Sequence, residues 1–113
     1  MSKFDPAVTL PQTIDFITEA QTLVVGISLE QLLADPIKLR AFERVMELVG
    51  ESVKRVPQDF RDTHSQIPWK KIAGMRDVIS HAYEDLAYEV LWDVVEMHFP
   101  KLLKDLKQIL SDL

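Results

Sequence analysis

Cysteine is absent from the 113 residues, and glycine occurs only three times. Without cysteine the chain can form no disulfide bond, no zinc–thiolate site and no thiol nucleophile. No apolar run approaches the roughly 20 residues that a membrane-spanning helix needs, and the start MSKFDPAVTL lacks the pattern of a secretory signal. With 47% hydrophobic and 27% charged residues the composition is that of a globular protein, which we expect to work in the cytoplasm.

Positive charge is scarce overall, because 13 Lys and Arg stand against 18 acidic residues and the net charge is −5. The distribution is uneven. Residues 38–76 carry nine bases and five acids, whereas residues 77–100 carry six acids and no Lys or Arg. The basic middle could hold a polyanion, and the candidates for this role are Lys54, Arg55, Lys70, Lys71 and Arg76. The same charges also fit ordinary solvated helix faces, so charge alone leaves both interpretations open.

Proline and capping residues separate a series of helical patterns, and alternating strand-like runs are missing. Apolar residues at three- and four-residue spacing predict helices over about residues 10–25, 29–34 and 36–56, then from Pro68 through residue 86. The apolar pattern continues from Leu91 to Met97, and a last helix is expected after Pro100. We predict an all-α protein, a bundle of four to five main helices in a single domain over residues 1–113.

Histidine is the residue best suited to acid–base chemistry, and the chain has three. We expect His64 and His98 to be structural or merely exposed. His81 lies on the helix predicted after Pro68. At about 100° per residue, the polar residues of this helix form one arc that begins beside the apolar stripe and ends at His81. The arc comprises Arg76, Asp77, Ser80, His81 and Tyr83. The arc either faces solvent or lines a cleft against another chain. No histidine or carboxylate spacing typical of a metal site occurs, so no metal or other cofactor is expected.

Other residues allow two interpretations each. Trp69, next to Pro68, could stack on a base or anchor the start of its helix, and we expect the second. Glu47 and Glu51 lie one helical turn apart and are expected on a solvated face.

The segment Arg76-Asp77-Val78-Ile79-Ser80-His81-Ala82-Tyr83, with its lead-in IPWKKIAGMR, resembles the RX4HXY signature of HEPN-domain ribonuclease toxins of the HepT type. The resemblance covers nearly the whole chain. It implies a HEPN-type helical bundle and metal-independent RNA cleavage in which Arg76 and His81 are catalytic. Asp77 stands where relatives often carry asparagine; it and Ser80 are expected to give polar support, and Lys70 and Lys71 to contact RNA at the cleft edge.

The resemblance also implies regulation by a partner. HepT-like toxins pair with a nucleotidyltransferase antitoxin of the MntA type in a type II toxin–antitoxin system, and the antitoxin can transfer AMP to the motif tyrosine, which here is Tyr83. Because Tyr83 follows Arg76 by seven residues, on an ideal helix AMP would place an anion beside the guanidinium.

RNA cleavage without a metal needs a base, an acid and positive charge on the phosphorane. One chain offers a single motif histidine, so we predict a homodimer in which each copy contributes one His81 and one Arg76, as the resemblance also implies. The main alternative is a non-catalytic helical module that docks on a nucleotidyltransferase. An ordinary nucleic-acid-binding bundle, with affinity but no turnover, is a third possibility.

Overall fold

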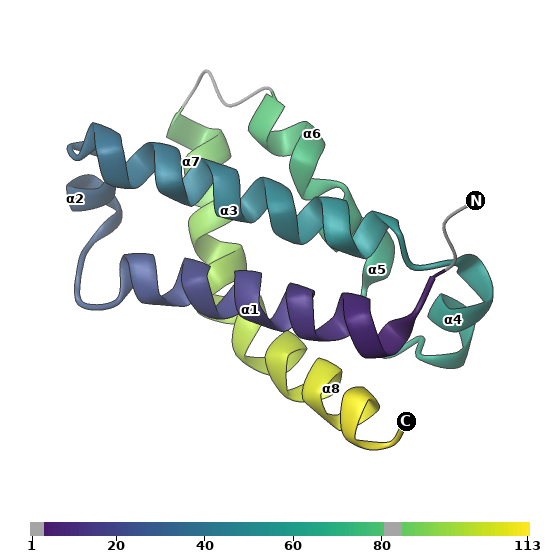
Figure 1. Ribbon diagram of the computed structural model, residues 1–113. Coiled ribbons are helices and arrows are strands. Elements are labelled where there is room, and N and C mark those ends of the chain that lie inside the picture. The colour runs from purple at the N-terminus through teal and green to yellow at the C-terminus, as the bar shows by residue number, and fades with distance from the viewer. Residues whose placement is uncertain (1–3, 81–84) are drawn as a thin grey trace.

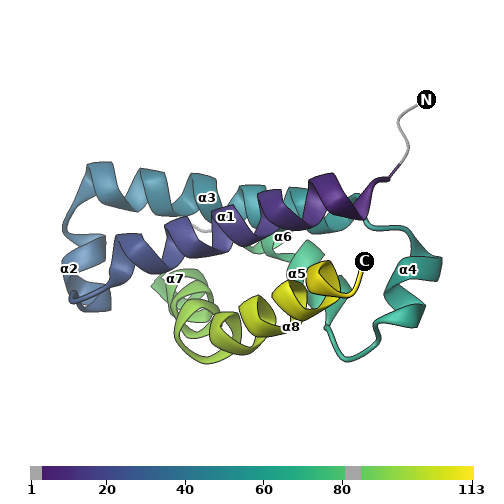
Figure 2. The same ribbon diagram turned by 60° about the horizontal axis from the view of Figure 1, so that its bottom comes forward.

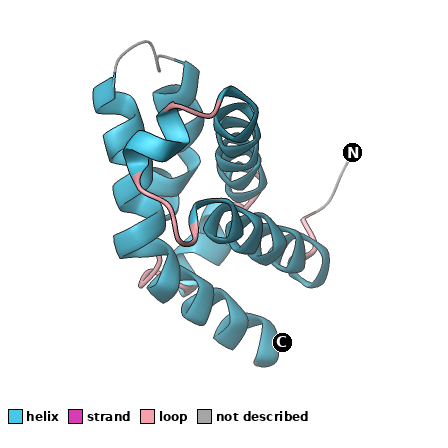
Figure 3. Ribbon diagram, turned by 90° about the vertical axis from the view of Figure 1, so that its left-hand side faces the viewer, coloured by secondary structure: helices cyan, strands magenta, loops and turns pink. Residues whose placement is uncertain are grey.

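The computed structural model describes residues 4–80 and 85–113, and every regular element within these ranges is helical (Figures 1 and 3). The order is α1 Pro6–Val24, α2 Leu29–Leu33, α3 Pro36–Lys54, α4 Gln58–Thr63, α5 Trp69–Ala73, α6 Met75–Ser80, α7 Asp85–Asp93, the π-helix η1 Val94–His98, and α8 Phe99–Ser111. This confirms the predicted all-α fold class, while the homodimer stays a prediction. No helix within the described ranges is long and apolar enough to cross a membrane.

Local capping signals fix the first three helices. Ser28 and Gln31 form the predicted capping box, with hydrogen bonds of 3.2 and 2.8 Å. Asp35 caps α3 by accepting from the Lys38 main-chain N–H at 3.1 Å, and Pro36 occupies the first turn. Gly26 has a φ of +76°, which few residues other than glycine adopt, and so lets the chain turn after α1.

The predicted start of the first helix at about residue 10 was wrong. The helix begins at Pro6, because Asp5 accepts from the Ala7 main-chain N–H at 3.0 Å and the proline occupies the first turn. Pro11 lies inside the helix. The one intrahelical bond that it cannot donate would go to the carbonyl of Ala7, in the exposed first turn, where water can replace it.

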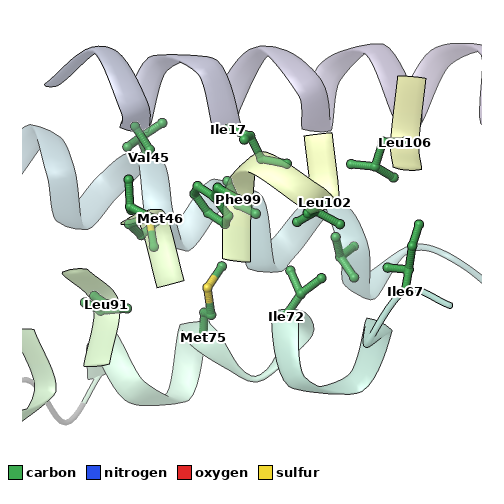
Figure 4. Packing of buried hydrophobic residues seen from close by; sticks show 14 of the residues in the cluster. Ile17, Val45, Met46, Ile67, Ile72, Met75, Leu91, Phe99, Leu102 and Leu106 are labelled. Carbon is green, nitrogen blue, oxygen red and sulfur yellow. The ribbon is translucent and has the colours of Figure 1, made fainter. Parts of the chain in front are cut away.

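The long helix α3 lies in the centre of the packing. It runs beside α1 on one side and packs against α5 and α6 on the other (Figures 1 and 2). The apolar stripe predicted for α3 is fully buried. Helix α8 packs against the side of α1 that faces the core. Figure 4 shows Phe99 at the centre of this core, among side chains from α1, α3, α6 and α8, such as Ile17, Met46, Met75 and Leu102.

The helix expected from Pro68 through residue 86 is broken at Gly74. The Gly74 carbonyl accepts from the Asp77 N–H at 3.1 Å and from the Val78 N–H at 3.4 Å, so the chain tightens between α5 and α6. Ile72 and Met75 are buried as expected, and Ile79 is half-buried. Ala82 and Leu86, the rest of the predicted stripe, lie outside the residues whose side chains the structure describes.

The last helix does not start anew at Pro100. The chain stays helical from α7 through η1 into α8, with Pro100 in the first turn of α8. The π-helix is wider than an α-helix and holds an extra residue per turn, which changes the register of the side chains that follow. Met97, which the apolar pattern includes, is nevertheless 73% exposed, because it lies two residues after the buried Val95 and so faces roughly the opposite side of the helix.

A buried pair of hydroxyl groups joins α1 to α3. The Thr13 hydroxyl lies 2.9 Å from the Ser52 hydroxyl and 2.9 Å from the Thr9 carbonyl, and Ser52 donates to the Val49 carbonyl at 2.9 Å. Both side chains are 1% exposed. If one hydroxyl were removed, water could not reach the buried hydroxyl that remained, so the Thr13–Ser52 contact contributes to stability.

Replacing Thr13 by valine keeps the shape of the side chain and removes its hydroxyl. We expect the free energy of unfolding to fall by about 1 kcal/mol, measured by chemical denaturation. Thr18→Val on the same helix is the matched control, because the Thr18 hydroxyl donates to the Ile14 carbonyl at an exposed position. Equal stability of the Thr13→Val and wild-type proteins would contradict this account.

Candidate active site

The described part of the motif lies on α6, directly after the break at Gly74. Arg76, Asp77 and Ser80 are exposed, and the Ser80 hydroxyl donates to the Arg76 carbonyl at 3.0 Å. Met75 is buried beside them. The guanidinium of Arg76 is therefore accessible to a phosphate from solvent. His81 and Tyr83, the other two motif residues, lie outside the described residues.

Helix α3 approaches the main chain at the start of α6 closely, and this contact fixes the distance between the two helices. A Cβ atom added to Gly50 would lie 3.3 Å from the main-chain nitrogen of Arg76 and 3.4 Å from the carbonyl oxygens of Ile72 and Ala73. Only glycine leaves room for this approach without some displacement of the neighbouring backbone. A lone glycine inside a helical pattern can indicate such a contact, but the sequence does not show which segment packs against it.

A second contact joins α3 to the helix after the motif. The Tyr88 hydroxyl on α7 donates to Glu43 Oε1 on α3 at 3.2 Å, and both residues are half-buried. Because 45 residues separate the two partners, no pattern within one helix could have predicted this pair. The two contacts hold α6 and α7 against the same helix.

The structure places the predicted RNA contacts on α5, and their contact with RNA stays a prediction. Lys70 and Lys71 are exposed on α5. Lys71 lines a groove that faces η1 and α8, whereas the Arg76 main chain lies against α3. Lys54 and Arg55, at the end of α3, are also exposed. The exposed basic residues thus lie at the end of α3, on α5 and on α6.

The groove beside Lys71 has a volume of about 320 Å³. Its floor is apolar and includes Ile72, Met75 and Leu102, and its rim carries Lys71, His98 and Lys101. Lys101 also pairs with Asp105 at 2.7 Å. Within the described residues, no group of three or more His, Cys, Asp or Glu side chains could hold a metal ion.

Trp69 anchors its helix, as expected. It is 4% exposed, and its Nε1–H donates to the His64 carbonyl at 2.9 Å, so its ring is not available to stack on a base. The His64 ring is half-buried and packs on Phe60, with ring centroids 4.6 Å apart, whereas His98 is exposed. Glu47 and Glu51 are half-buried rather than fully solvated, and Glu47 pairs with Arg44 at 3.2 Å.

Arg61 has a structural role that the charge pattern did not reveal. Its Nε donates to the Val56 carbonyl at 2.8 Å and its Nη2 to the Val53 carbonyl at 3.2 Å. These carbonyls lie at and just after the C-terminal end of α3, where a cation is favourable. Arg61 therefore belongs to the fold and is not a candidate for the active site.

Comparisons with known proteins agree on one family. The family described as "Ribonuclease HepT-like" matches residues 13–109. A "Putative RNase" of Caldanaerobacter subterraneus subsp. tengcongensis is 43% identical over 100 residues, which cover 88% of this chain and 87% of the relative. A "Putative RNase" of Methanocaldococcus jannaschii is 31% identical over 110 residues, 97% of this chain and 85% of the relative.

A further relative carries the family name itself. The "Probable ribonuclease HepT" of Thermococcus cleftensis is 40% identical over 76 residues, 67% of this chain and 69% of the relative. No solved structure matches the chain at a significant level.

Proposed function

The chain belongs to the ribonuclease HepT-like family, and from this premise we propose that it is a metal-independent endoribonuclease toxin whose RNA site lies between two copies. The family assignment confirms the resemblance seen in the sequence and the prediction of a ribonuclease. The observation that carries the proposal is the spacing of Arg76, His81 and Tyr83, with the Arg76 side chain exposed on α6. The proposed unit is one HepT-like domain over residues 1–113, which acts on RNA in the cytoplasm.

The proposed reaction uses only side-chain chemistry. The imidazole of one His81 takes the proton from a ribose 2′-hydroxyl, and the 2′-oxygen attacks the phosphorus. The 5′-oxygen leaves with a proton from the imidazolium of the second His81, so the products are a cyclic 2′,3′-phosphate and a 5′-hydroxyl. Histidine suits both steps because its ordinary pKa is about 6.5. Arg76 stays charged and stabilises the phosphorane through two parallel hydrogen bonds.

The neighbouring polar residues have supporting roles in this proposal. Ser80, through its bond to the Arg76 carbonyl, stabilises the turn that presents the guanidinium. Asp77 lies next to Arg76 in the sequence and lowers the positive charge at the site. In this proposal Lys70 and Lys71, which are exposed on α5, contact RNA phosphates at the edge of the cleft.

One face of the molecule suits contact with a second copy. The exposed ridge on α7 and η1 comprises Val90, which is 44% exposed, Val94, and Met97, which is 73% exposed. Val94 and Met97 of this ridge also line the 320 Å³ groove, so the ridge forms one wall of the groove. A two-fold contact needs a patch that complements itself. This patch has both parts, an apolar ridge and an apolar groove, and both signs of charge, in Glu89 and Asp93 and in Lys71 and Lys101.

Regulation by an MntA-like nucleotidyltransferase antitoxin completes the proposal. AMP on Tyr83 would add a bulky anion seven residues after Arg76. This anion would compete with the RNA phosphate for the guanidinium and fill the site between the two copies.

Replacing Arg76 by alanine removes the proposed phosphate ligand. We expect cleavage of single-stranded RNA, assayed in EDTA, to slow roughly 100- to 1,000-fold, with an unchanged circular dichroism spectrum. Arg40→Ala is the control, because Arg40 is an exposed cation near the start of α3, ten residues from Gly50. If wild type and Arg76→Ala were equally inactive, the non-catalytic docking module would be the better account.

Replacing Met97 by aspartate puts a charge on the proposed contact between copies. We expect sedimentation to show a monomer, and RNA cleavage to be lost because each copy has one His81. Val25→Asp is the matched control, since Val25 is a hydrophobic residue that is 75% exposed at the end of α1. A monomeric wild-type protein that cleaves RNA at full rate would overturn the shared site.

Replacing Tyr83 by phenylalanine removes the proposed acceptor of AMP. We expect this variant to cleave RNA and to stay active after incubation with the antitoxin and ATP, whereas the wild-type protein gains the mass of AMP and loses activity. Mass spectrometry and the RNA assay measure the two effects. Silencing of the Tyr83→Phe protein through the transferase activity would contradict this mode of regulation.

A further inference from the structure

The motif segment is held at both ends by one helix. At its start, Gly50 of α3 lies against the main-chain nitrogen of Arg76, 3.3 Å from an added Cβ atom. Beyond its end, Glu43 of α3 accepts the hydrogen bond from Tyr88 on α7 at 3.2 Å. His81 and Tyr83 fall in the sequence between these two points.

The two points lie on the same face of α3. Glu43 and Gly50 are seven residues apart, which is two turns and roughly 10 Å along the axis at about 1.5 Å per residue. Because a continuous helix is stiff, α3 sets the spacing between the start of α6 and the first turns of α7. The position of α6 relative to α7 therefore limits how far Arg76 can lie from the residues of α7.

The bond at Tyr88 supplies a constraint that apolar packing does not. Among the residues of α7 whose side chains are described, Leu91 is the apolar one with no exposed surface. Tyr88 and Trp92 are half-buried against the core beside it. Apolar burial of this kind has little directional preference, so it sets the position of α7 on α3 less precisely than a directional bond. The hydrogen bond from Tyr88 is directional and joins one atom of α7 to one atom of α3.

We propose that Glu43 and Tyr88 are a positioning pair for the active site, an inference that rests on the proposed ribonuclease function. Their hydrogen bond joins α7 to α3 just after the motif segment. Neither residue touches the reacting atoms. The pair acts by keeping α7 in register with α6, so that the motif residues of both copies meet one phosphate in the geometry that the reaction needs. Displacement of a reacting group by about 1 Å can cost roughly 100-fold in rate.

The test compares kcat and KM for a short single-stranded RNA in Tyr88→Phe, Glu43→Ala, Glu43→Gln and the double variant Glu43→Ala/Tyr88→Phe. We expect kcat to fall about tenfold or more in Tyr88→Phe and Glu43→Ala, with KM within twofold of wild type. The double variant should be no slower than the slower of the two single variants, because each of them already lacks the bond between Glu43 and Tyr88. Glu43→Gln should retain more of kcat than Glu43→Ala, since its amide oxygen still accepts from the phenol.

Thr13→Val is the matched control for a purely structural effect. This substitution also removes a single hydrogen bond to α3, but from the α1 side. The Thr13→Val protein should therefore be less stable than wild type but keep its kcat. All proteins are assayed at a temperature where they are folded. A wild-type kcat in Tyr88→Phe, a fall that Thr13→Val reproduces, or additive effects in the double variant would overturn the positioning role.

Hydrogen exchange separates a failure of this inference from a failure of the proposed function. In Tyr88→Phe, the amides of residues 75–93 should exchange faster while those of α1 keep the wild-type rate; unchanged exchange at 75–93 would overturn the inference whatever the activity. An inactive wild-type protein, or an Arg76→Ala protein that cleaves RNA normally, would overturn the proposed function, while faster exchange at 75–93 in Tyr88→Phe would still show that the pair holds α7 on α3.

Discussion

The burial of α3 between two layers is the constraint on which the rest of the structure depends. Its apolar stripe is enclosed, with Phe42, Met46 and Val49 at 0% exposure. On one side the Thr13–Ser52 contact fixes α1. On the other side Gly50 admits the backbone of α5 and α6. The geometry of the site depends on this helix, because α3 contacts the start of α6 through Gly50 and contacts α7 through Glu43.

Features that depend on neighbouring residues could be predicted from the sequence. The capping box at Ser28 and the cap at Asp35 are local hydrogen bonds, so residue type and spacing were sufficient. The stripe of α3 could be predicted because burial follows the helical period. The start at Pro6 was missed because the apolar pattern was followed only from about residue 10, whereas the helix begins at the Asp5 cap and Pro6.

Features that depend on packing could not be predicted. The break at Gly74 and the π-helix before Pro100 are small changes of helical geometry, and each changes the direction of the side chains that follow. For the site, the sequence supplied the residue types and the family, and the structure supplied the exposure of Arg76 and the contacts of α3. The pairing of Glu43 with Tyr88 joins distant positions, which periodicity does not link.

The role of Arg61 changes how the charge of this protein should be counted. Its guanidinium is committed to two main-chain carbonyls at the end of α3, so one of the nine bases between residues 38 and 76 neutralises the helix end instead of attracting nucleic acid. The number of counterions released when a polyanion binds reflects only the cations that reach phosphates. The salt dependence of association should therefore be shallower than the amino-acid composition of this segment suggests.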